Sequence, residues 1–559
     1  MCGIVAILSR TGERPTPTDA AVLEALDGAL AASSDASGSL AMVLDAVADH
    51  ATVADGLLRG VPGVLALADR PALILAVEAR LDQLDAFVAT RETLVEEGEG
   101  TSGPLEIADI EETNAALVRA KDVLWALRRD RLRTAAAVSA LAGRDGRTST
   151  LAGFYAVQLG LSAIDRLEVR GRDSAGLHLF VWDHGLDLDD PELSARLAAR
   201  GEDPLYPSGT VRVTGGALSF VYKAAAEIGE LGDNTAALRA AIRDDGLLHL
   251  ALAASDARVA VLGHTRWASV GIISEPNAHP VNSDEDTGDG TVDTDGPYVV
   301  AALNGDVDNH ADLRARAALV IPSPITTDAK VIPALVSREA RRAGLVEAFR
   351  RTVSTFDGSV AIAAASADEP GQVLLALRGS GQGVYIGLAD DVTIVASEPY
   401  GLVEVTDRYV RMDGETPAHP DQPLSNGQVL TLTAAAAGEL DGIVRLAYDG
   451  TALPVRPDEV VQAEVTTRDI DRGDAPHFLL KEIKEAPLSF AKTLRGHIVE
   501  QDGHLRVALG DQVLPASVRL VSVVVPLWLT AMTRVSSMRD RRWKPDSSVA
   551  VMGSMSSWS

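Results

Sequence analysis

The chain contains a single cysteine, Cys2, and its position next to the start of the chain points to nucleophilic chemistry. A thiol with a pKa near 8.5 is only slightly ionised at neutral pH, so it needs a base to become an efficient nucleophile. If Met1 is removed, Cys2 becomes the first residue, and its own α-amino group, with a pKa of about 7.7–8.0, can be that base. The plain alternative is an incidental cysteine at position 2, so other residues have to decide between the two.

Further motifs follow Cys2 along the chain. They are residues 170–176 (RGRDSAG), residues 263–269 (GHTRWAS) followed by residues 277–280 (NAHP), and the pair Asn304-Gly305. Each run is a weak signal alone, but together with the opening Cys2-Gly3-Ile4-Val5 they resemble, in the same order, the glutaminase domain of the glucosamine-6-phosphate synthases. These enzymes are class II glutamine amidotransferases of the N-terminal nucleophile hydrolase group. The resemblance implies glutamine hydrolysis.

The resemblance also implies which residues carry out the reaction. Cys2 would attack the glutamine amide, and Asn304 with the backbone N–H of Gly305 would stabilise the negative oxygen that forms. Arg170 and Gly171 match residues that line the nucleophile's end of the family site. Two structural alternatives stay open: Arg170 could only cap or brace its turn, and Asn304-Gly305 could be a tight turn after the preceding strand.

A second group of residues would bind the substrate. Arg266 matches the family's clamp for the glutamine carboxylate, a role that suits a guanidinium because it can hold two oxygens at once. Asp328 matches the aspartate that binds the substrate ammonium, although a helix N-cap before residues 331–336 is the competing interpretation. Trp267 and Ser269 belong to the loop that closes over glutamine in the family.

The elements that must position these residues form a strand-rich core. Residues 1–8 are apolar and predict a buried strand, and a helix over 153–169 and a strand over 176–182 flank the turn that contains Arg170. Six further short strands are predicted at 360–365, 373–376, 383–386, 392–396, 409–412 and 429–432. This core is compatible with the fold that the resemblance implies, an α+β four-layer αββα sandwich of the N-terminal nucleophile hydrolase type.

The expected domain organisation has three parts. Residues 1–470 would form the glutaminase domain, with a large helical insertion at 16–142 in which helices are predicted over 20–32 and 112–141. Residues 471–514, with a helix at 478–495, resemble the connector that leads to a sugar isomerase domain in the synthases. Residues 515–559 predict no fold. Too few residues follow the connector for an isomerase domain, so we expect the glutaminase half alone, as a truncated or frame-shifted copy or a natural short form.

Composition excludes several classes of function. The chain has 559 residues with 79 acidic and 51 basic side chains, and its formal charge of -28 has the wrong sign for binding nucleic acid. No leader or membrane-spanning run is recognised, which predicts a cytoplasmic protein without a membrane partner. One cysteine excludes an internal disulfide and a zinc site built from several thiolates. We expect neither a metal nor a cofactor.

The expected small-molecule partner is L-glutamine. Fructose 6-phosphate would be a partner only if isomerase domains are supplied elsewhere. Two other readings remain: a glutaminase that passes ammonia to another acceptor through a separate partner chain, and a catalytically silent binding or scaffold protein that uses residues 16–142 as its interaction surface. The sequence also allows a homo-oligomer.

Overall fold

The computed structural model describes residues 2–507 except 36–37, 98, 101–102, 105–106, 145, 202, 204, 227–229, 287–291, 294–295, 423–424, 495–497 and 502–503. The chain divides into two compact units. The first comprises Met1–Pro104 and Glu112–Ile470, and the second comprises Leu105–Glu111 and Asp471–Ser559. The predicted tail, residues 515–559, lies outside the described residues.

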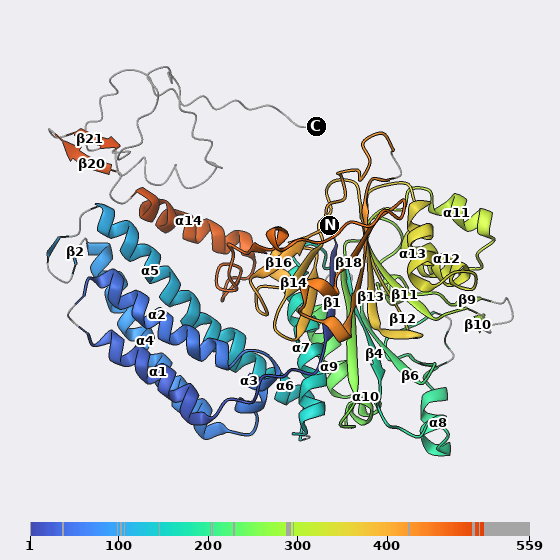
Figure 1. Cartoon of the computed structure of the whole chain (residues 1–559), viewed down its shortest axis with the longest axis horizontal. Helices are drawn as coiled ribbons and strands as arrows, with labels where there is room; N and C mark the ends of the chain where they lie inside the picture. Colours follow the sequence, from blue (N-terminus) through green and yellow to red (C-terminus); the bar gives the residue numbers. More distant parts are fainter. Residues whose placement is uncertain are drawn as a thin grey trace. The chain divides into compact units, whose positions relative to one another are not determined.

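Two large antiparallel sheets form the centre of the first unit (Figure 1). The nine-stranded sheet has the order β19-β16-β14-β15-β1-β7-β4-β6-β5, and the six-stranded sheet has the order β18-β17-β13-β12-β11-β8. The strands of the larger sheet are β1 (Gly3–Ser9), β4 (Ser174–Trp182), β5 (Val211–Thr214), β6 (Ala217–Ala224), β7 (Arg258–Arg266), β14 (Tyr385–Leu388), β15 (Val392–Ala396), β16 (Arg408–Arg411) and β19 (Val461–Gln462). Those of the smaller sheet are β8 (Val281–Asn282), β11 (Val299–Gly305), β12 (Val360–Ser366), β13 (Glu369–Arg378), β17 (Gln428–Thr433) and β18 (Val444–Ala447).

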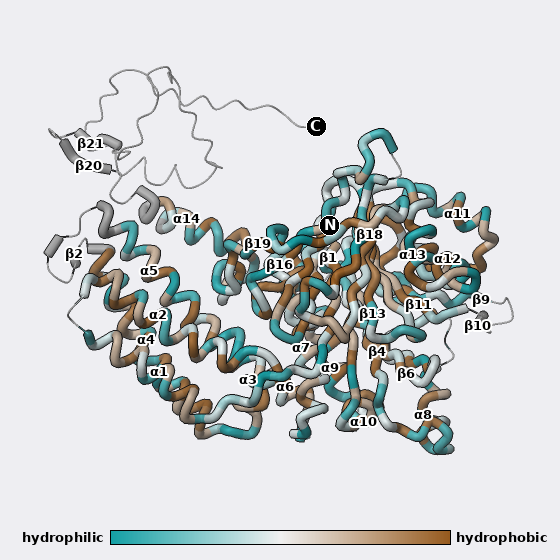
Figure 2. Tube along the Cα trace, viewed as in Figure 1, coloured by the Kyte–Doolittle hydropathy of each residue, from teal (hydrophilic) through white to brown (hydrophobic). Residues whose placement is uncertain are grey.

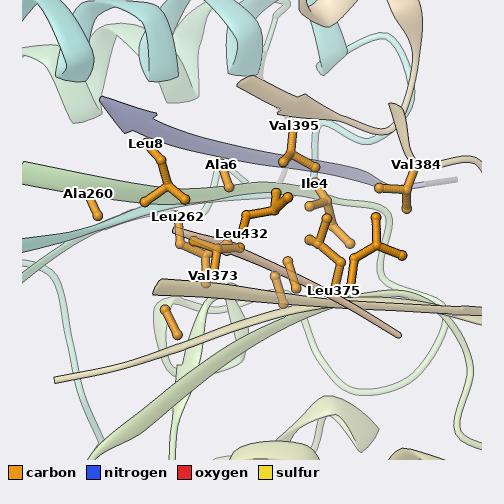
Figure 3. Close-up of a cluster of buried hydrophobic side chains, with 14 of the residues drawn as sticks. Ile4, Ala6, Leu8, Ala260, Leu262, Val373, Leu375, Val384, Val395 and Leu432 are labelled. Atoms are coloured by element: carbon orange, nitrogen blue, oxygen red, sulfur yellow. The ribbon is translucent and has the colours of Figure 1, made fainter. Parts of the chain in front are cut away.

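The two sheets pack face to face over an apolar core. Ile4, Ala6 and Leu8 of β1 point into this core, where they join side chains of the smaller sheet such as Leu375 and Leu432 (Figure 3). Successive strand residues point to opposite faces, so the intervening residues of β1 lie on the outer face of the larger sheet. Both faces of β1 are buried, which explains why its sequence is continuously apolar rather than alternating. Figure 2 shows the same concentration of hydrophobic residues in the central strands.

Helices cover the outer face of each sheet. The helices α7 (Thr148–Leu167) and α9 (Asp233–Arg243) pack on the nine-stranded sheet, whereas α12 (Val331–Ala340) and α13 (Leu345–Ser354) pack on the six-stranded sheet. A second apolar cluster fills the space under α12 and α13. The result is the four-layer αββα sandwich that the resemblance implies, and the predicted α+β class is confirmed. The remaining helices of this core are α8 (Pro191–Ala198), α10 (Gly246–Ala251) and α11 (His310–Ala317).

The predicted helical insertion is also present between β1 and α7. Its helices are α1 (Asp19–Ser33), α2 (Leu40–Leu57), α3 (Gly60–Leu67), α4 (Pro71–Glu97), α5 (Ile107–Trp125) and α6 (Arg133–Ala142), with a π-helical turn at Ala126–Leu132. The helical spacing predicted over 112–141 is therefore confirmed, since α5, the π-helical turn and α6 follow one another without a non-helical residue. Capping by Thr18, whose hydroxyl accepts the N–H of Ala21 at 3.2 Å, sets the start of α1.

The described residues of the second unit include the helix α14 (Phe478–Leu494), with Pro487 inside it, and a hairpin of β20 (Ile498–Gln501) and β21 (His504–Val507). The helix predicted over 478–495 is confirmed to within one residue. Short two-stranded pairs also form between β2 (Glu99–Gly100) and β3 (Gly103–Pro104), and between β9 (Glu285–Asp286) and β10 (Val292–Asp293).

Within the described part of the chain, no single helix combines the length and apolarity needed to cross a membrane. The bent pair Gly60–Leu67 and Pro71–Val95 passes that test only when its two helices are taken together.

Candidate active site

Cys2 lies immediately before β1, at the end of the central strand of the larger sheet. The next residue, Gly3, pairs with Thr265 of β7, so the thiol lies beside the point where β7 ends and the chain continues into Trp267. The Cys2 sulfur accepts the backbone N–H of Trp267 at 3.2 Å and lies 3.4 Å from the carbonyl oxygen of the same residue. Only 9% of Cys2 is exposed. The pairing of β1 with β7 next to Cys2 therefore fixes the position of the thiol.

The surroundings of Cys2 act on its ionisation in opposite directions. Burial raises the pKa of the thiol, whereas the N–H of Trp267 and the guanidinium of Arg266 lower it. The carboxylate of Asp306 opposes ionisation and raises the pKa further. The balance leaves the Cys2 pKa above its ordinary value, so the thiol depends on a nearby base to become a thiolate.

The turn that contains Arg170 and Gly171 packs directly against the end of β7. A Cβ atom on Gly171 would lie 2.5 Å from the nitrogen of Trp267 and 2.6 Å from the carbonyl carbon of Arg266, so only glycine permits this approach. The N–H of Asp173 donates to the carbonyl of Arg266 at 3.1 Å, and its carboxylate accepts the N–H of Ala268 at 2.8 Å. The RGRD run thus holds the backbone on either side of Trp267.

Arg170 itself is buried and forms an ion pair with Glu398, in the segment that follows β15. The sequence left open whether Arg170 acts in the site or braces its turn. The contact with Glu398 ties the turn to the strand on the other side of β1, which is a bracing role. The residue after Arg170, Gly171, packs on the Trp267 backbone that contacts the Cys2 thiol. A role in the active site is therefore compatible with the bracing role of Arg170.

Arg266 is the last residue of β7, and its side chain is almost completely buried. Its guanidinium donates to the carbonyl of Ile272 at 3.1 Å and to the carbonyl of Val270, in the loop that follows β7. Burial lowers the pKa of Arg266, while the neighbouring Cys2 and Asp328 raise it. Arg266 is thus a buried cation within electrostatic reach of the thiol and of a carboxylate.

Asn304 is fully buried near the end of β11, and its amide is held on both sides. The side-chain oxygen lies 3.0 Å from Nε2 of His264, and the side-chain nitrogen donates to the hydroxyl of Ser397 at 2.7 Å. The same Ser397 hydroxyl accepts the N–H of Ile4 at 2.8 Å. A continuous hydrogen-bonded chain therefore connects Asn304 to the strand that carries Cys2.

The neighbouring histidines are neutral. Burial lowers the pKa of His264 to about 3, and burial lowers the pKa of His279 well below its ordinary value. The two rings are tilted by 34° relative to one another, with centroids 4.6 Å apart. A neutral His264 with an N–H on Nε2 donates to the Asn304 oxygen and turns the Asn304 nitrogen towards Ser397. Its function in this geometry is to orient Asn304.

Asn304 and Gly305 are both strand residues, so the tight turn that was their alternative is not what the structure contains. Gly305 has a φ of 92°, which is available to glycine without strain, and a Cβ there would lie 2.0 Å from the carbonyl oxygen of Ser359. The next residue, Asp306, accepts the hydroxyl of Ser269 at 2.7 Å. This bond connects the end of β11 to the loop after β7.

Asp328 lies opposite this strand end and is buried. Its carboxylate accepts the backbone N–H of Val307 at 2.8 Å. The N-cap of α12 is Lys330, and Asp328 instead begins a 3₁₀ turn whose N-cap is Thr327. The N-cap alternative for Asp328 therefore does not hold. Burial raises the pKa of Asp328, because the carboxylate is shielded from water next to a second acidic residue, Asp306.

The NAHP run, residues 277–280, forms hydrogen bonds with the two residues that precede Asp328. The side-chain oxygen of Asn277 accepts the N–H groups of Thr326 at 2.7 Å and of Thr327 at 2.9 Å. Nε2 of His279 lies 3.0 Å from the hydroxyl of Thr327. Two motifs that are about 50 positions apart are thus joined by hydrogen bonds, and together they set the backbone from which Asp328 projects.

Trp267 and Ser269 lie in the loop that passes over the site. The Trp267 side chain is 58% exposed, and the Ser269 hydroxyl reaches Asp306. The backbone of Trp267 contacts the thiol while its indole faces solvent. This combination fits a segment whose side chain is available to a ligand.

All nine predicted site residues therefore belong to one connected region at the ends of β1, β7 and β11. They are Cys2, Arg170, Gly171, Arg266, Trp267, Ser269, Asn304, Gly305 and Asp328. Sequence reasoning missed two participants, Ser397 and Asp306. The signal for each was only a polar residue next to a strand end, which occurs throughout the chain. Among the residues that the structure describes, no three His, Cys, Asp or Glu side chains are placed to hold a metal ion.

No protein-family model matches the chain. Its sequence is similar to curated glutamine–fructose-6-phosphate aminotransferases [isomerizing], another name for the glucosamine-6-phosphate synthases. The enzyme from Leifsonia xyli subsp. xyli is 31% identical over 258 residues, which cover 45% of this chain and 36% of that protein. The enzyme from Halalkalibacterium halodurans is 28% identical over 247 residues, covering 44% and 35%.

Two solved structures are also similar. An allosteric regulatory enzyme of purine biosynthesis matches at 16% identity and a TM-score of 0.31, covering 52% of this chain and 46% of its own. Glutamine phosphoribosylpyrophosphate amidotransferase from B. subtilis, in complex with ADP and GMP, matches at 16% identity and the same TM-score, covering 52% and 47%. A TM-score of 0.31 is too low to support an argument about the fold. The description of the fold is based on the sheets and helices of this chain. The chain spans about a third of the length of its curated relatives, and over that part it is homologous to the glutamine–fructose-6-phosphate aminotransferases.

Proposed function

We propose that the chain hydrolyses L-glutamine to glutamate and ammonia, with Cys2 as the nucleophile. The observation that carries this proposal is the position of the Cys2 sulfur, 3.2 Å from the Trp267 nitrogen and next to the buried guanidinium of Arg266. A structural cysteine has no need of a buried cation, a buried carboxylate and an oriented amide around it. Glutamine has three groups that match these partners.

The ends of the substrate would be bound by opposite charges. Arg266 has five N–H donors, of which the carbonyls of Val270 and Ile272 use only part, so it can also hold the α-carboxylate of glutamine. Asp328 would accept the α-ammonium. Because the substrate brings its own positive charge, binding would lower the pKa of Asp328, which burial raises in the free protein.

The reaction would proceed through a thioester. The free α-amino group of Cys2, exposed by removal of Met1, takes the thiol proton, and the sulfur attacks the side-chain amide carbon. The Asn304 side-chain nitrogen and the Gly305 N–H stabilise the resulting oxyanion. The α-ammonium returns the proton to the leaving nitrogen, ammonia departs and the thioester remains. Water, activated by the same amine, then releases glutamate and restores the thiol.

The destination of the ammonia is a separate part of the proposal. The relatives are named for transfer to fructose 6-phosphate, and the chain spans about a third of their length. We therefore propose the glutaminase part of that reaction for this chain, with fructose 6-phosphate aminated only where isomerase domains are supplied elsewhere. A partner chain that carries another acceptor is the second candidate.

The test measures glutamate release by the purified full chain. We expect glutaminase activity in the wild type and none in Cys2→Ala, with loss of Met1 verified by mass spectrometry of the intact protein. A Cys2→Ser variant should keep the fold and lose most of the activity, because an alcohol is a poorer nucleophile than a thiol. Thermal unfolding of each variant controls for folding.

The outcomes separate the alternatives. Activity that survives Cys2→Ala would rule out the mechanism. A correctly processed wild type that releases no glutamate would favour the binding or scaffold role. Glutamine turnover that rises on addition of fructose 6-phosphate, with formation of the aminated sugar by this chain alone, would contradict the assignment of the glutaminase part only.

A further inference from the structure

Lys330 is the last residue of the 3₁₀ turn Asp328–Lys330, and its side chain is completely buried. Its ammonium donates to the carbonyl of Asn282 at 2.8 Å, to the side-chain oxygen of Asn282 at 2.8 Å and to the carbonyl of Asp284 at 2.7 Å. A lysine ammonium has three N–H donors. All three donors of Lys330 are therefore used within the protein.

The charge of Lys330 persists in this buried place. Burial lowers the pKa of Lys330 to about 8, whereas the carboxylates of Asp284 and Glu285 raise it. Because this pKa lies above neutrality, the ammonium keeps its three donors at neutral pH. Three directed bonds allow fewer positions of the turn than an apolar contact would, since hydrophobic contacts have no preferred direction.

The acceptors of the Lys330 ammonium are themselves held in place. Asn282 belongs to β8 and pairs with Val300 of β11 in the six-stranded sheet. Its side-chain nitrogen donates to the carboxylate of Asp284 at 2.7 Å. The same carboxylate accepts the guanidinium of Arg212, in β5 of the nine-stranded sheet, at 2.9 Å. The ammonium thus attaches the turn to a segment that is bound to both sheets.

Asp328 lies at the other end of the turn, between two attachments. Asn277 binds the backbone of the two residues before Asp328, and Lys330 binds the residues around β8. Between them, the Asp328 carboxylate accepts the N–H of Val307 at the end of β11. The position of this carboxylate therefore depends on the attachment at each end of its segment.

We propose that Lys330 is a positioning residue for glutamine binding, because its ammonium holds the turn from which the Asp328 carboxylate faces the substrate α-ammonium. This inference rests on the role proposed above for Asp328. The three N–H bonds of Lys330 all go to residues 282 and 284, so its effect on the substrate passes through Asp328. Loss of the ammonium should therefore weaken glutamine binding and leave the chemistry at Cys2 unchanged.

Steady-state kinetics of glutamate release by the full chain tests the proposal. Lys330→Met keeps most of the side-chain length and removes the charge, and it should raise KM for glutamine about tenfold while kcat changes less than about twofold. Asn282→Ala removes one of the three acceptors and should raise KM by about threefold. Thermal unfolding checks that each variant is folded. If Lys330→Met does not fold, Asn282→Ala decides.

Hydrogen exchange of the Val307 amide provides a measurement that needs no glutamine. This amide donates to Asp328, so a turn that is held less firmly should let it exchange faster, by about tenfold in Lys330→Met. Mass spectrometry of the peptide that contains Val307 follows the exchange. A wild type that releases no glutamate would contradict the proposed function, and the exchange rates would still decide whether Lys330 positions Asp328.

Lys223→Met is the matched control. Lys223, on β6, is also buried, but its ammonium lies 4.8 Å from the centroid of the Tyr206 ring and makes no hydrogen bond with any residue that the structure describes. This variant should leave KM and the exchange of the Val307 amide unchanged. A folded Lys330→Met with an unchanged KM overturns the proposal, and so does a loss confined to kcat or an equal rise of KM in Lys223→Met.

Discussion

Ser397 connects the oxyanion donor to the nucleophile's strand, because its hydroxyl accepts from Ile4 and from Asn304. Removing the hydroxyl in Ser397→Ala leaves the Asn304 amide held only by His264. We expect kcat for glutamine hydrolysis to fall about tenfold, the effect of roughly 1.4 kcal/mol, with little change in KM, since Ser397 would act on the transition state through Asn304. Steady-state kinetics on the purified variant measures both constants.

Ser366→Ala is a suitable control, since Ser366 is also fully buried and its hydroxyl donates to the carbonyl of Tyr298 at 3.0 Å, in the core away from the thiol. It should reduce stability without a specific loss of kcat. If Ser397→Ala raised KM and left kcat intact, Ser397 would not position the oxyanion donor.

Asp306 provides a pH-dependent test of the site. Burial raises the pKa of Cys2, and Asp306 raises it further. Asp306→Asn removes one opposing charge, so the Cys2 pKa should fall and the thiolate should form at lower pH. The rate of alkylation by iodoacetamide as a function of pH measures this shift directly, because Cys2 is the only cysteine in the chain.

Asp308→Asn, two positions away on the same segment, is the matched control and should leave the alkylation curve in place. A curve for Asp306→Asn that moves to higher pH, or does not move, would contradict the electrostatic role of Asp306.

Residues of this kind cannot be predicted from the sequence. The motifs identify residues within short runs, and the structure brings those runs together. Ser397 is 393 positions from Ile4 and 93 positions from Asn304, and its contacts exist only because β15 pairs with β1. A serine after an apolar strand has no signature of its own. The sequence could therefore predict the candidate groups but not what orients them.

At the scale of elements, a buried ionic network joins the helical insertion to the sandwich. Arg131, in the π-helical turn, donates to Asp55 of α2 at 2.8 Å and to the carbonyl of Glu404 at 2.9 Å. The Glu404 carboxylate in turn accepts the hydroxyl of Thr134 at 2.6 Å and the guanidinium of Arg166 at 2.5 Å. Arg131 and Thr134 of the helical insertion thus both bind Glu404 of the sandwich.

Arg131→Met should destabilise the protein by about 3 kcal/mol, because it removes a cation from two buried acceptors while keeping most of the side-chain volume. Arg59 still reaches Asp55 at 2.8 Å, which limits the loss. Chemical denaturation measures the free energy of unfolding.

Arg128→Met is the control. Arg128 lies in the same turn, but its partners Asp82 and Asp85 are on the surface, so replacing the arginine should reduce the free energy of unfolding by less than about 1 kcal/mol. Equal losses in the two variants would contradict the role of the buried network.

The helices differ in how well the sequence predicts their presence and their bounds. The helix α7 was expected over 153–169 and begins five residues earlier, because residues 148–152 continue the helix after an uncapped start. The helix α2 is rich in alanine and buried on several sides, so it lacks the single apolar stripe that identifies a surface helix. Tertiary contacts, rather than periodicity, stabilise these elements.

At the scale of the whole molecule, the first compact unit runs in sequence up to Ile470. Its last residues are tied to the helical insertion, since the Thr467 hydroxyl donates to Asp130 at 2.6 Å and Arg468 pairs with Asp122 at 2.7 Å. Burial raises the pKa of Asp130 to about 6, which makes the Thr467 bond part of a desolvated cluster. These contacts bind the end of the first unit to the helical insertion, and the boundary predicted at residue 470 can be tested on them.

A chain that ends after Ile470 should fold as the full chain does and keep its glutaminase kcat/KM, because the described site residues and their partners all precede that position. A chain that ends after Glu464 lacks Thr467 and Arg468, leaves Asp130 and Asp122 without these partners, and should unfold several degrees lower. Differential scanning calorimetry compares the two, with the full chain as reference. Loss of activity in the longer truncation, while its Tm is unchanged, would mean that residues 471–559 contribute to catalysis, and the boundary at 470 would then have to be abandoned.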